Sequence, residues 1–383
     1  PQLVFQNTLC PHQDYIYFNF PTVEESDILM NYTKRATEVS DNIISSGILY
    51  KALESSGLIN NYTAKEELIY DDADFRTITS IDTCRVKRVN NTDFLVAQIK
   101  GNKCSYGFQF YGGNKQATTE DRKVKTFEGL AGDTYLGVLR MDVDNLGSIF
   151  IKGLPNKSFS AYSTLSFLLD FFFSGYLNTI KEKYKDDVNI LYSGGDDVFA
   201  IGKWNIVAEF AKDIREEFRR FVGRDDISIS GGLAIVRPKY PIAKAAEMAG
   251  EAEKSAKDYS PQKDAFNIFG ETITWGKEFD YVLALKNEFV DCVNHSNLRK
   301  SLLHQLMRYA SIVKHNKISK ERDLKYIWHS AYYLTRYIES TDKSDKLTVA
   351  LCERLRNKEL TSGDRNYELV ALAARWAELE IRN

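Results

Sequence analysis

The sequence feature that most constrains the fold is the run NILYSGGDDVFAIG at positions 189–202. Two short apolar runs with β-branched or aromatic residues flank a Gly-Gly pair, and Asp196 and Asp197 follow that pair directly. Short apolar runs are typical of strands, and a pair of glycines between them is typical of a tight turn. The sequence therefore predicts a β-hairpin that carries two adjacent carboxylates at its tip.

A second acidic segment follows another predicted strand. Residues 135–141 are apolar with one exception, as expected for a strand buried on both faces, and the segment DVD at 142–144 comes next. The elements predicted after it are a helix at 160–185, the hairpin, a helix at 204–221, a strand at 227–236, a helix at 241–257 and a short strand at 265–269. This is the order of the split β-α-β-β-α-β, or ferredoxin-like, arrangement with an addition. Its first strand lies beside the hairpin strands, so we expect Asp142 to converge with Asp196 and Asp197.

The rest of the chain divides into two further regions. Residues 1–130 combine helical spacing at 27–56 with alternation at 83–111, which predicts a small mixed segment of one helix and a small antiparallel sheet. Residues 277–383 are almost entirely of helical pattern, with aromatic residues recurring at core spacing, and predict an antiparallel bundle of four or five helices. We therefore predict an α+β chain in three parts, with the ferredoxin-like domain at 131–276.

Length, charge and cysteine content exclude several classes of protein. The chain has 383 residues and a formal net charge of −2, which argues against a uniformly basic nucleic-acid-binding protein. Its five cysteines are far apart and form no C-x-x-C pair, so we expect reduced thiols, no zinc knuckle and a cytoplasmic location. We expect no membrane span and no signal peptide, and the start at Pro1 leads us to expect a piece of a longer protein.

The three acids suggest a chemistry. Carboxylates held within a few ångström repel one another unless a divalent cation lies between them, and oxygen ligands without His or Cys favour Mg²⁺ or Mn²⁺. Such sites are used in nucleotidyl transfer, and Gly194 and Gly195 would let a triphosphate or a base approach the backbone. The simpler alternative for these four residues is a solvated turn. Asp144 either supports the metal ligands or caps the turn after the strand.

Further candidate binding residues surround this centre, and each has a structural alternative. The N–H groups of Asn145, Leu146 and Gly147 could hold phosphate oxygens, or these residues could be simply a loop. The Ser193 hydroxyl could bond a ribose or a base, or only its own turn. Two lysines near the last predicted strand could bind a triphosphate or be solvated, namely Lys257 and Lys263, whereas Lys254 is better explained as a solvated residue.

Several separated motifs occur in the same order as in a known family. They are LGVLRMDVDNLG at 136–147, YSTLS at 162–166, YSGGDDVFAIG at 192–202 and KDAFNIFGE at 263–271. These motifs resemble the second palm domain of the large subunit of type III-A CRISPR effector complexes, densely over residues 126–276. The resemblance implies a palm of the polymerase and nucleotide-cyclase type that condenses ATP, with Mg²⁺ or Mn²⁺, into cyclic oligoadenylates when the complex binds target RNA. The implied partners are the other subunits of the complex, CRISPR RNA, target RNA and ATP, with no membrane.

The resemblance also implies roles for particular residues. Asp142, the Val143 carbonyl, Asp196 and Asp197 would hold the metal, the three acids being the catalytic residues. Lys257 corresponds to a helix lysine that related cyclases use on the triphosphate. The helical tail would pack on small subunits of the complex. Family members also carry an upstream HD nuclease domain, a first palm and a paired-cysteine zinc region, and none is visible here, so this chain would hold half of a composite ATP site.

Two other functions stay open. The first is a relative of diguanylate cyclases that uses GTP, although the sequence has Asp197-Val198 where those enzymes have Glu-Phe. The second is a non-catalytic palm that serves as a scaffold for CRISPR RNA and protein subunits. The presence of Asp142, Asp196 and Asp197 together argues against the scaffold, since a scaffold has no need to confine three acids.

Overall fold

In the computed structural model the chain forms two compact units, residues 1–132 with 141–227 and residues 133–140 with 228–383. The structure describes residues 15–19, 61–63, 83–89, 103–109, 112–113, 116–120, 123–152, 159–224, 226–319 and 323–382. The helix predicted at 27–56 lies outside these residues. The predicted domain boundaries at 130 and 276 stay predictions.

The N-terminal region contains a four-stranded sheet of order β2-β1-β3-β4. Its strands are β1 (Tyr15–Asn19), β2 (Asn61–Thr63), β3 (Thr83–Val89) and β4 (Lys103–Gln109). β1 is antiparallel to β2 and β3, but β3 and β4 are parallel, in a register that pairs Cys84 with Cys104. The prediction of an antiparallel sheet was therefore wrong for this pair, because residues 90–102 are long enough for a crossover rather than a hairpin.

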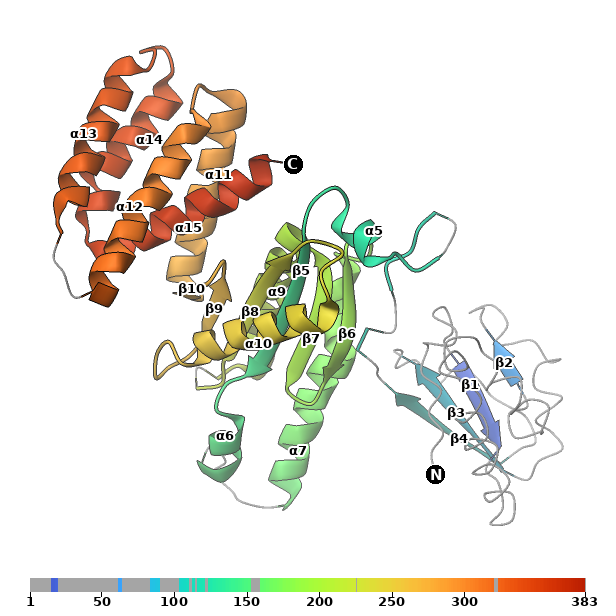
Figure 1. The fold of residues 1–383 in the computed structure, drawn as a ribbon. Coiled ribbons are helices and arrows are strands. Elements are labelled where there is room, and N and C mark those ends of the chain that lie inside the picture. The colour runs from blue at the N-terminus through green and yellow to red at the C-terminus, as the bar shows by residue number, and fades with distance from the viewer. Residues whose placement is uncertain are drawn as a thin grey trace. The chain divides into compact units, whose positions relative to one another are not determined.

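The larger sheet has six strands in the order β10-β9-β8-β5-β7-β6 (Figure 1). The strands are β5 (Leu136–Val143), β6 (Val188–Gly194), β7 (Asp197–Lys203), β8 (Ile229–Val236), β9 (Ala265–Ile268) and β10 (Glu271–Thr274). The first four strands of this sheet along the chain are β5, β6, β7 and β8. They follow the ferredoxin-like order, in which β5 lies between β8 and β7. This order confirms the predicted fold, and the β9–β10 hairpin is the addition.

The first compact unit carries the helices that precede and follow the β6–β7 hairpin. They are α5 (Phe127–Ala131), α6 (Leu146–Lys152), α7 (Phe159–Asp170), a π-helix (Phe171–Tyr176), α8 (Leu177–Glu182) and α9 (Trp204–Val222). The helix predicted at 160–185 is thus interrupted by one π-helical segment, a feature that often marks a functional site. This segment buries both Phe172 and Phe173 against Phe218 of α9, with ring centroids 5.1 and 5.7 Å apart.

The second unit carries α10 (Ile242–Lys257) and a bundle of five described helices, as predicted (Figure 1). The bundle consists of α11 (Lys277–His295), α12 (Lys300–Ser319), α13 (Lys325–Ser340), α14 (Lys346–Asn357) and α15 (Asp364–Ile381). Helix α15 packs along α11 and α12. The rings of Phe266, Trp275, Phe279 and Trp376 form one cluster that joins β9 to the bundle.

Two of the five cysteines lie among residues whose side chains are described. Cys292 and Cys352 are buried and not disulfide-bonded, as expected. Burial and nearby negative groups raise the pKa of the Cys292 thiol to about 11 and that of Cys352 to about 12. Both thiols are therefore protonated and unreactive near neutral pH. Among the described helices, none is long and apolar enough to cross a bilayer.

Candidate active site

The β6–β7 hairpin holds the Gly-Gly-Asp-Asp sequence at its tip. Gly194 pairs with Asp197, so Gly195 and Asp196 form the turn. Gly195 has a φ of +66°, as the first turn position of a type II′ hairpin requires. A Cβ on Gly195 would have no heavy atom within 4 Å, so the glycine is needed for its backbone conformation and leaves open space at the tip.

The end of β5 lies against this turn. The Val143 N–H donates to the Asp196 carbonyl oxygen at 3.1 Å. Asp142, Asp196 and Asp197 are all half-buried, whereas Asp144 is only 1% exposed. The structure therefore brings the two acidic segments together, as the strand order predicts.

The carboxylates themselves do not form a ready-made metal cluster. Within the described part of the chain, no group of three or more His, Cys, Asp or Glu side chains is arranged to hold an ion. The donors that Asp142, Asp196 and Asp197 offer are still hard oxygens, which suit Mg²⁺ or Mn²⁺. Metal binding by these residues stays a prediction, and it requires some adjustment of their side chains.

Tyr192 is a functional candidate that the sequence reasoning missed. Its pKa is raised, first by the negative charge of Asp197, then by burial, by a hydrogen bond to Asp197 and by the charge of Asp196. An irregularity in the β6–β7 register between Ile190 and Tyr192 shifts the residues that follow relative to β7. The raised pKa reports a negative potential at the hairpin tip, which attracts cations. The available signal was an aromatic residue two positions before the Gly-Gly pair.

The loop after β5 begins with a left-handed residue. Asn145 has a φ of +56°, a conformation that asparagine tolerates better than most residues, and it is exposed. Leu146 is half-buried and begins α6, and a Cβ on Gly147 would meet nothing within 4 Å. The loop thus leaves space on this side, and its role in phosphate binding stays a prediction.

The Ser193 hydroxyl has a structural partner. It donates to the carbonyl oxygen of Phe173, in the π-helix, at 2.6 Å. Its proton is therefore used to hold β6 against that helix, and only its lone pairs remain for a ligand. This observation favours the structural alternative for Ser193, although its role in ligand binding stays a prediction.

The candidate lysines belong to the second compact unit. Lys257 lies 3.4 Å from Glu253, a carboxylate that Arg140 also approaches at 3.5 Å. A Cβ on Gly250 would lie 2.9 Å from an Arg140 nitrogen, so the glycine makes room for this guanidinium. Glu253 is buried, and it therefore fixes the direction of Lys257. Lys254 is exposed, as expected for a solvated residue.

Lys263 lies in an unusual stretch of backbone. It has a φ of +57°, and the next residue, Asp264, has a φ of +43°. Two consecutive non-glycine residues in the left-handed region cost roughly 1–3 kcal/mol each, and such strain is often found at functional sites. This strain occurs directly before β9 and supports Lys263 as a candidate functional residue. Phosphate binding by Lys263 stays a prediction.

Comparison with known proteins supports the family resemblance. Residues 135–267 match the family model described as Cas10/Cmr2, second palm domain. The chain is 36% identical over 191 residues to the single-strand-specific deoxyribonuclease Cas10/Csm1 (subtype III-A) of Methanocaldococcus jannaschii, which covers 42% of this chain and 24% of that protein. Its counterpart from Streptococcus thermophilus is 31% identical over 270 residues, 67% of this chain and 34% of that protein. The chain thus spans about a third or less of the length of these relatives.

Solved structures show the same fold. A Csm1–Csm4 cassette in complex with cA4 matches with a TM-score of 0.58 and 20% identity over 79% of this chain and 44% of the other. Csm1 in T. onnurineus matches with a TM-score of 0.55 and 22% identity over 76% of this chain and 45% of the other. The resemblance to the C-terminal portion of Cas10/Csm1, the large subunit of type III-A CRISPR complexes, is therefore confirmed.

Proposed function

We propose that this chain is the palm and helical bundle of a type III CRISPR effector subunit, and that its Gly-Gly-Asp-Asp hairpin condenses ATP into cyclic oligoadenylates. The observation that carries the proposal is the hydrogen bond from the Val143 N–H to the Asp196 carbonyl, which places the acidic end of β5 beside the acidic hairpin tip. Solved relatives described as bound to one ATP and to cA4 support the choice of adenine nucleotide.

The donor set fits a divalent cation. Asp142, Asp196, Asp197 and the Val143 carbonyl would hold Mg²⁺ or Mn²⁺, and the raised pKa of Tyr192 is consistent with a cation-attracting tip. When bound, the ion lowers the pKa of an attacking ribose hydroxyl and neutralises the leaving pyrophosphate.

The protein's own residues supply space and orientation. The open surroundings of Gly147 and Gly195 admit a triphosphate close to the backbone. Lys257, held by Glu253, offers a positive charge for phosphate oxygens. The partners proposed for the chain are the other subunits of an effector complex, CRISPR RNA and target RNA, because relatives occur as Csm1–Csm4 subcomplexes.

The test uses an effector complex assembled with this chain and supplied with target RNA and labelled ATP or GTP. The double variant Asp196→Ala/Asp197→Ala is expected to reduce cyclic oligoadenylate synthesis at least about 100-fold, because it removes two metal ligands. Asp186→Ala, which changes an exposed acid away from the tip, is the matched control and is expected to leave synthesis unchanged. Undiminished synthesis by the double variant, or product from GTP alone, would overturn the proposal.

A further inference from the structure

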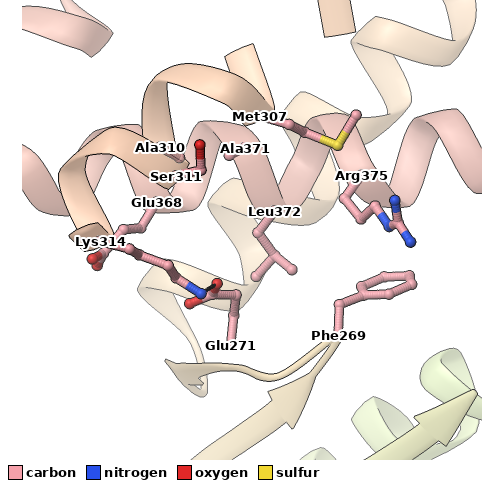
Figure 2. Close-up of a pocket in the computed structure, with 10 residues that line it drawn as sticks. All are labelled: Phe269, Glu271, Met307, Ala310, Ser311, Lys314, Glu368, Ala371, Leu372 and Arg375. Carbon is pink, nitrogen blue, oxygen red and sulfur yellow. Dashed lines mark ion pairs between the residues drawn. The ribbon is translucent and has the colours of Figure 1, made fainter. Parts of the chain in front are cut away.

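A hollow of about 350 Å³ lies in the second unit between α12, α15 and the β9–β10 turn (Figure 2). Each helix lines it with four residues at i, i+3, i+4 and i+7, which is one helical face. The facing positions Ala310, Ser311 and Ala371 are small, so the helices leave space between them. The volume is at the lower end of the range for small-molecule sites.

The hollow has an apolar middle and two polar ends. Leu372 lies in the middle, with Phe269 and Arg375 at one end and the ion pair of Lys314 with Glu271 at the other (Figure 2). A site of this kind suits a ligand with a flat apolar body, an anionic group at one end and both donors and acceptors at the other.

Arg375 supplies the positive charge. Its guanidinium lies 4.0 Å from Glu378, at the limit of an ion pair, and Arg382 contacts the same carboxylate more closely. The Arg375 side chain is 53% exposed, so it can turn toward an anion in the hollow. Arginine often binds phosphate or carboxylate with two parallel hydrogen bonds.

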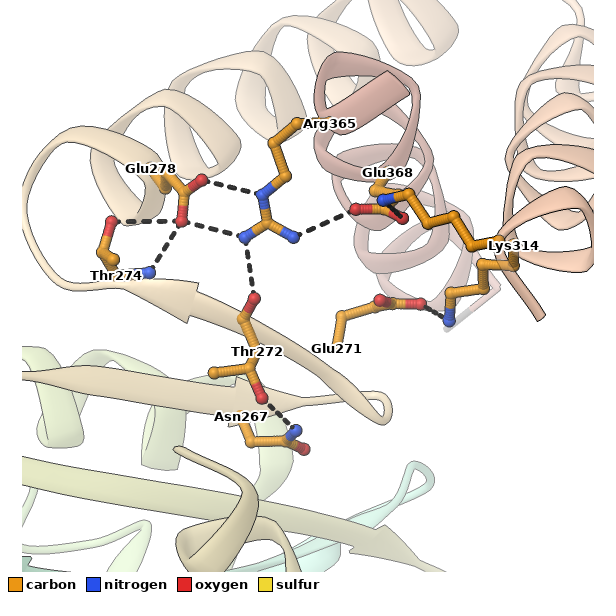
Figure 3. A network of polar contacts seen from close by, with 9 residues as sticks. Asn267, Glu271, Thr272, Thr274, Glu278, Lys314, Arg365 and Glu368 are labelled. Atoms are coloured by element: carbon orange, nitrogen blue, oxygen red, sulfur yellow. Dashed lines mark hydrogen bonds and ion pairs between the residues drawn. The ribbon is translucent and has the colours of Figure 1, made fainter. Parts of the chain in front are cut away.

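The acid of α15 at the other end of the hollow from Arg375 is already neutralised. Glu368 binds Lys317 at 2.5 Å. It also binds Arg365 at 3.2 Å (Figure 3). Glu271 is likewise paired with Lys314. The carboxylates that line the hollow therefore do not repel an anion at the Arg375 end.

Phe269 supplies a stacking surface in a strained position. It has a φ of +55°, which a bulky residue rarely adopts. Its ring meets Trp376 in a T-shaped contact with centroids 6.4 Å apart. This contact fixes the ring at the edge of the hollow (Figure 2). A residue held in such a conformation suggests that its ring position matters for function.

We propose that this hollow binds a nucleoside monophosphate unit, with its phosphate on Arg375, its base against Phe269 and Leu372, and the polar edge of the base at the Lys314–Glu271 pair. A plain aromatic acid would leave that donor and acceptor pair unused, whereas a base edge carries both kinds of group. The unit comes either from a free mononucleotide or from a nucleotide of an RNA strand. None of the residues of this site belongs to the Gly-Gly-Asp-Asp hairpin, and the proposal does not depend on the proposed synthesis.

The test is a calorimetric titration of the full chain with AMP in EDTA, which removes metal-dependent binding. We expect saturable binding tighter than about 1 mM, and at least about tenfold weaker binding of adenosine and of ribose 5-phosphate, because each lacks one half of the ligand. Arg375→Gln should weaken AMP binding about tenfold, and Phe269→Leu should weaken it severalfold. The matched control Arg336→Gln, on the exposed face of α13, should leave AMP binding unchanged.

The hairpin variant Asp196→Ala/Asp197→Ala is expected to bind AMP normally, which separates this site from the proposed active site. A 5′-phosphorylated oligoadenylate that binds at least tenfold tighter than AMP, and still depends on Arg375, supports the site and identifies RNA as the source. Equal affinities for AMP and for the oligoadenylate also support the site and identify a free mononucleotide as the source. The proposal is overturned if AMP does not bind, if ribose 5-phosphate binds as well as AMP, or if Arg375→Gln has no effect.

Discussion

At the scale of single residues, the most informative contacts surround Lys257. Glu253 is buried between two cations, Arg140 and Lys257, at 3.5 and 3.4 Å. A buried carboxylate with two cationic partners holds each of them in a narrow range of positions. Sequence reasoning selected Lys257, but it found neither partner, because a pairing between β5 and α10 depends on tertiary packing that no local pattern encodes.

Lys257→Ala is expected to raise the KM for ATP of the assembled complex about tenfold with a smaller effect on kcat, since it removes a charge from ground-state binding of the triphosphate. Lys254→Ala, an exposed lysine on the same helix, is the matched control. Steady-state kinetics over a range of ATP concentrations measures both parameters. Equal KM values for the two variants would remove Lys257 from the binding site.

Asp345 gives a pH-dependent contribution to stability. Burial alone would raise its pKa, but hydrogen bonds from Ser296, Thr348 and Asn297 outweigh this and lower the pKa to about 2 from its usual 3.8. A lowered pKa stabilises the fold above about pH 4, and the stabilisation is lost as the pH falls toward 2. The Asp345 carboxylate also caps the first turn of α14 by accepting from the Thr348 N–H.

Asp345→Ala is therefore expected to reduce the free energy of unfolding by about 1–2 kcal/mol at pH 7. It should also flatten the loss of stability between about pH 4 and pH 2. Urea unfolding at several pH values measures both effects, and Asp291→Ala, an exposed acid of α11, is the comparison. If the free energy of unfolding of Asp345→Ala fell below pH 4 as steeply as that of the unaltered chain, Asp345 would not be the responsible group.

At the scale of elements, Arg365 is one of the side chains that tie the β9–β10 hairpin to the helical bundle, besides the aromatic cluster and the Lys314–Glu271 pair. Arg365 of α15 donates to both carboxylate oxygens of Glu278, at 2.8 and 2.9 Å, and to the Thr272 carbonyl at 2.8 Å (Figure 3). Burial would lower the pKa of Arg365, but these hydrogen bonds and charges raise it overall. Burial would likewise raise the pKa of Glu278, but its partners lower it.

Arg365→Gln is expected to reduce the free energy of unfolding by about 2 kcal/mol, because it leaves the half-buried Glu278 without its bidentate partner. Arg336→Gln, in a surface pair with Glu339, is the control and should cost less than about 0.5 kcal/mol. Chemical denaturation with tryptophan fluorescence measures both variants, and Trp376 and Trp275 report on this region. A loss no larger than that of Arg336→Gln would contradict the role assigned to Arg365.

Much of the element order was predictable, and the reasons are physical. The apolar run of β5 and the Gly-Gly pair of the hairpin are strong local signals, and the ferredoxin-like strand order follows from them. The π-helical segment and the parallel pairing of β3 with β4 were not predictable. The π-helical segment depends on packing against a distant helix, such as that of Phe173 against Phe218. The pairing of β3 with β4 was not predictable because a connection of the length of residues 90–102 allows either a hairpin or a crossover.

At the scale of the whole molecule, the described residues include a palm, a helical bundle and a four-stranded N-terminal sheet, and the chain spans about a third or less of the length of its curated relatives. The acids of the proposed active site lie in one compact unit, and the lysines and the proposed nucleotide pocket lie in the other. Activity is therefore to be tested in an assembled complex, whereas metal binding and AMP binding can be tested on this chain.

The most direct test of the central claim is electron paramagnetic resonance of free Mn²⁺ titrated with the full chain without added nucleotide, because ATP itself binds Mn²⁺. Asp142 and the pair Asp196/Asp197 are expected to act together, so Asp142→Ala and Asp196→Ala/Asp197→Ala should each weaken Mn²⁺ binding at least about tenfold, a loss of roughly 1.4 kcal/mol. Asp186→Ala should bind Mn²⁺ as the unaltered chain does. Equal Mn²⁺ binding by all four proteins would contradict the claim that these three acids form a metal site.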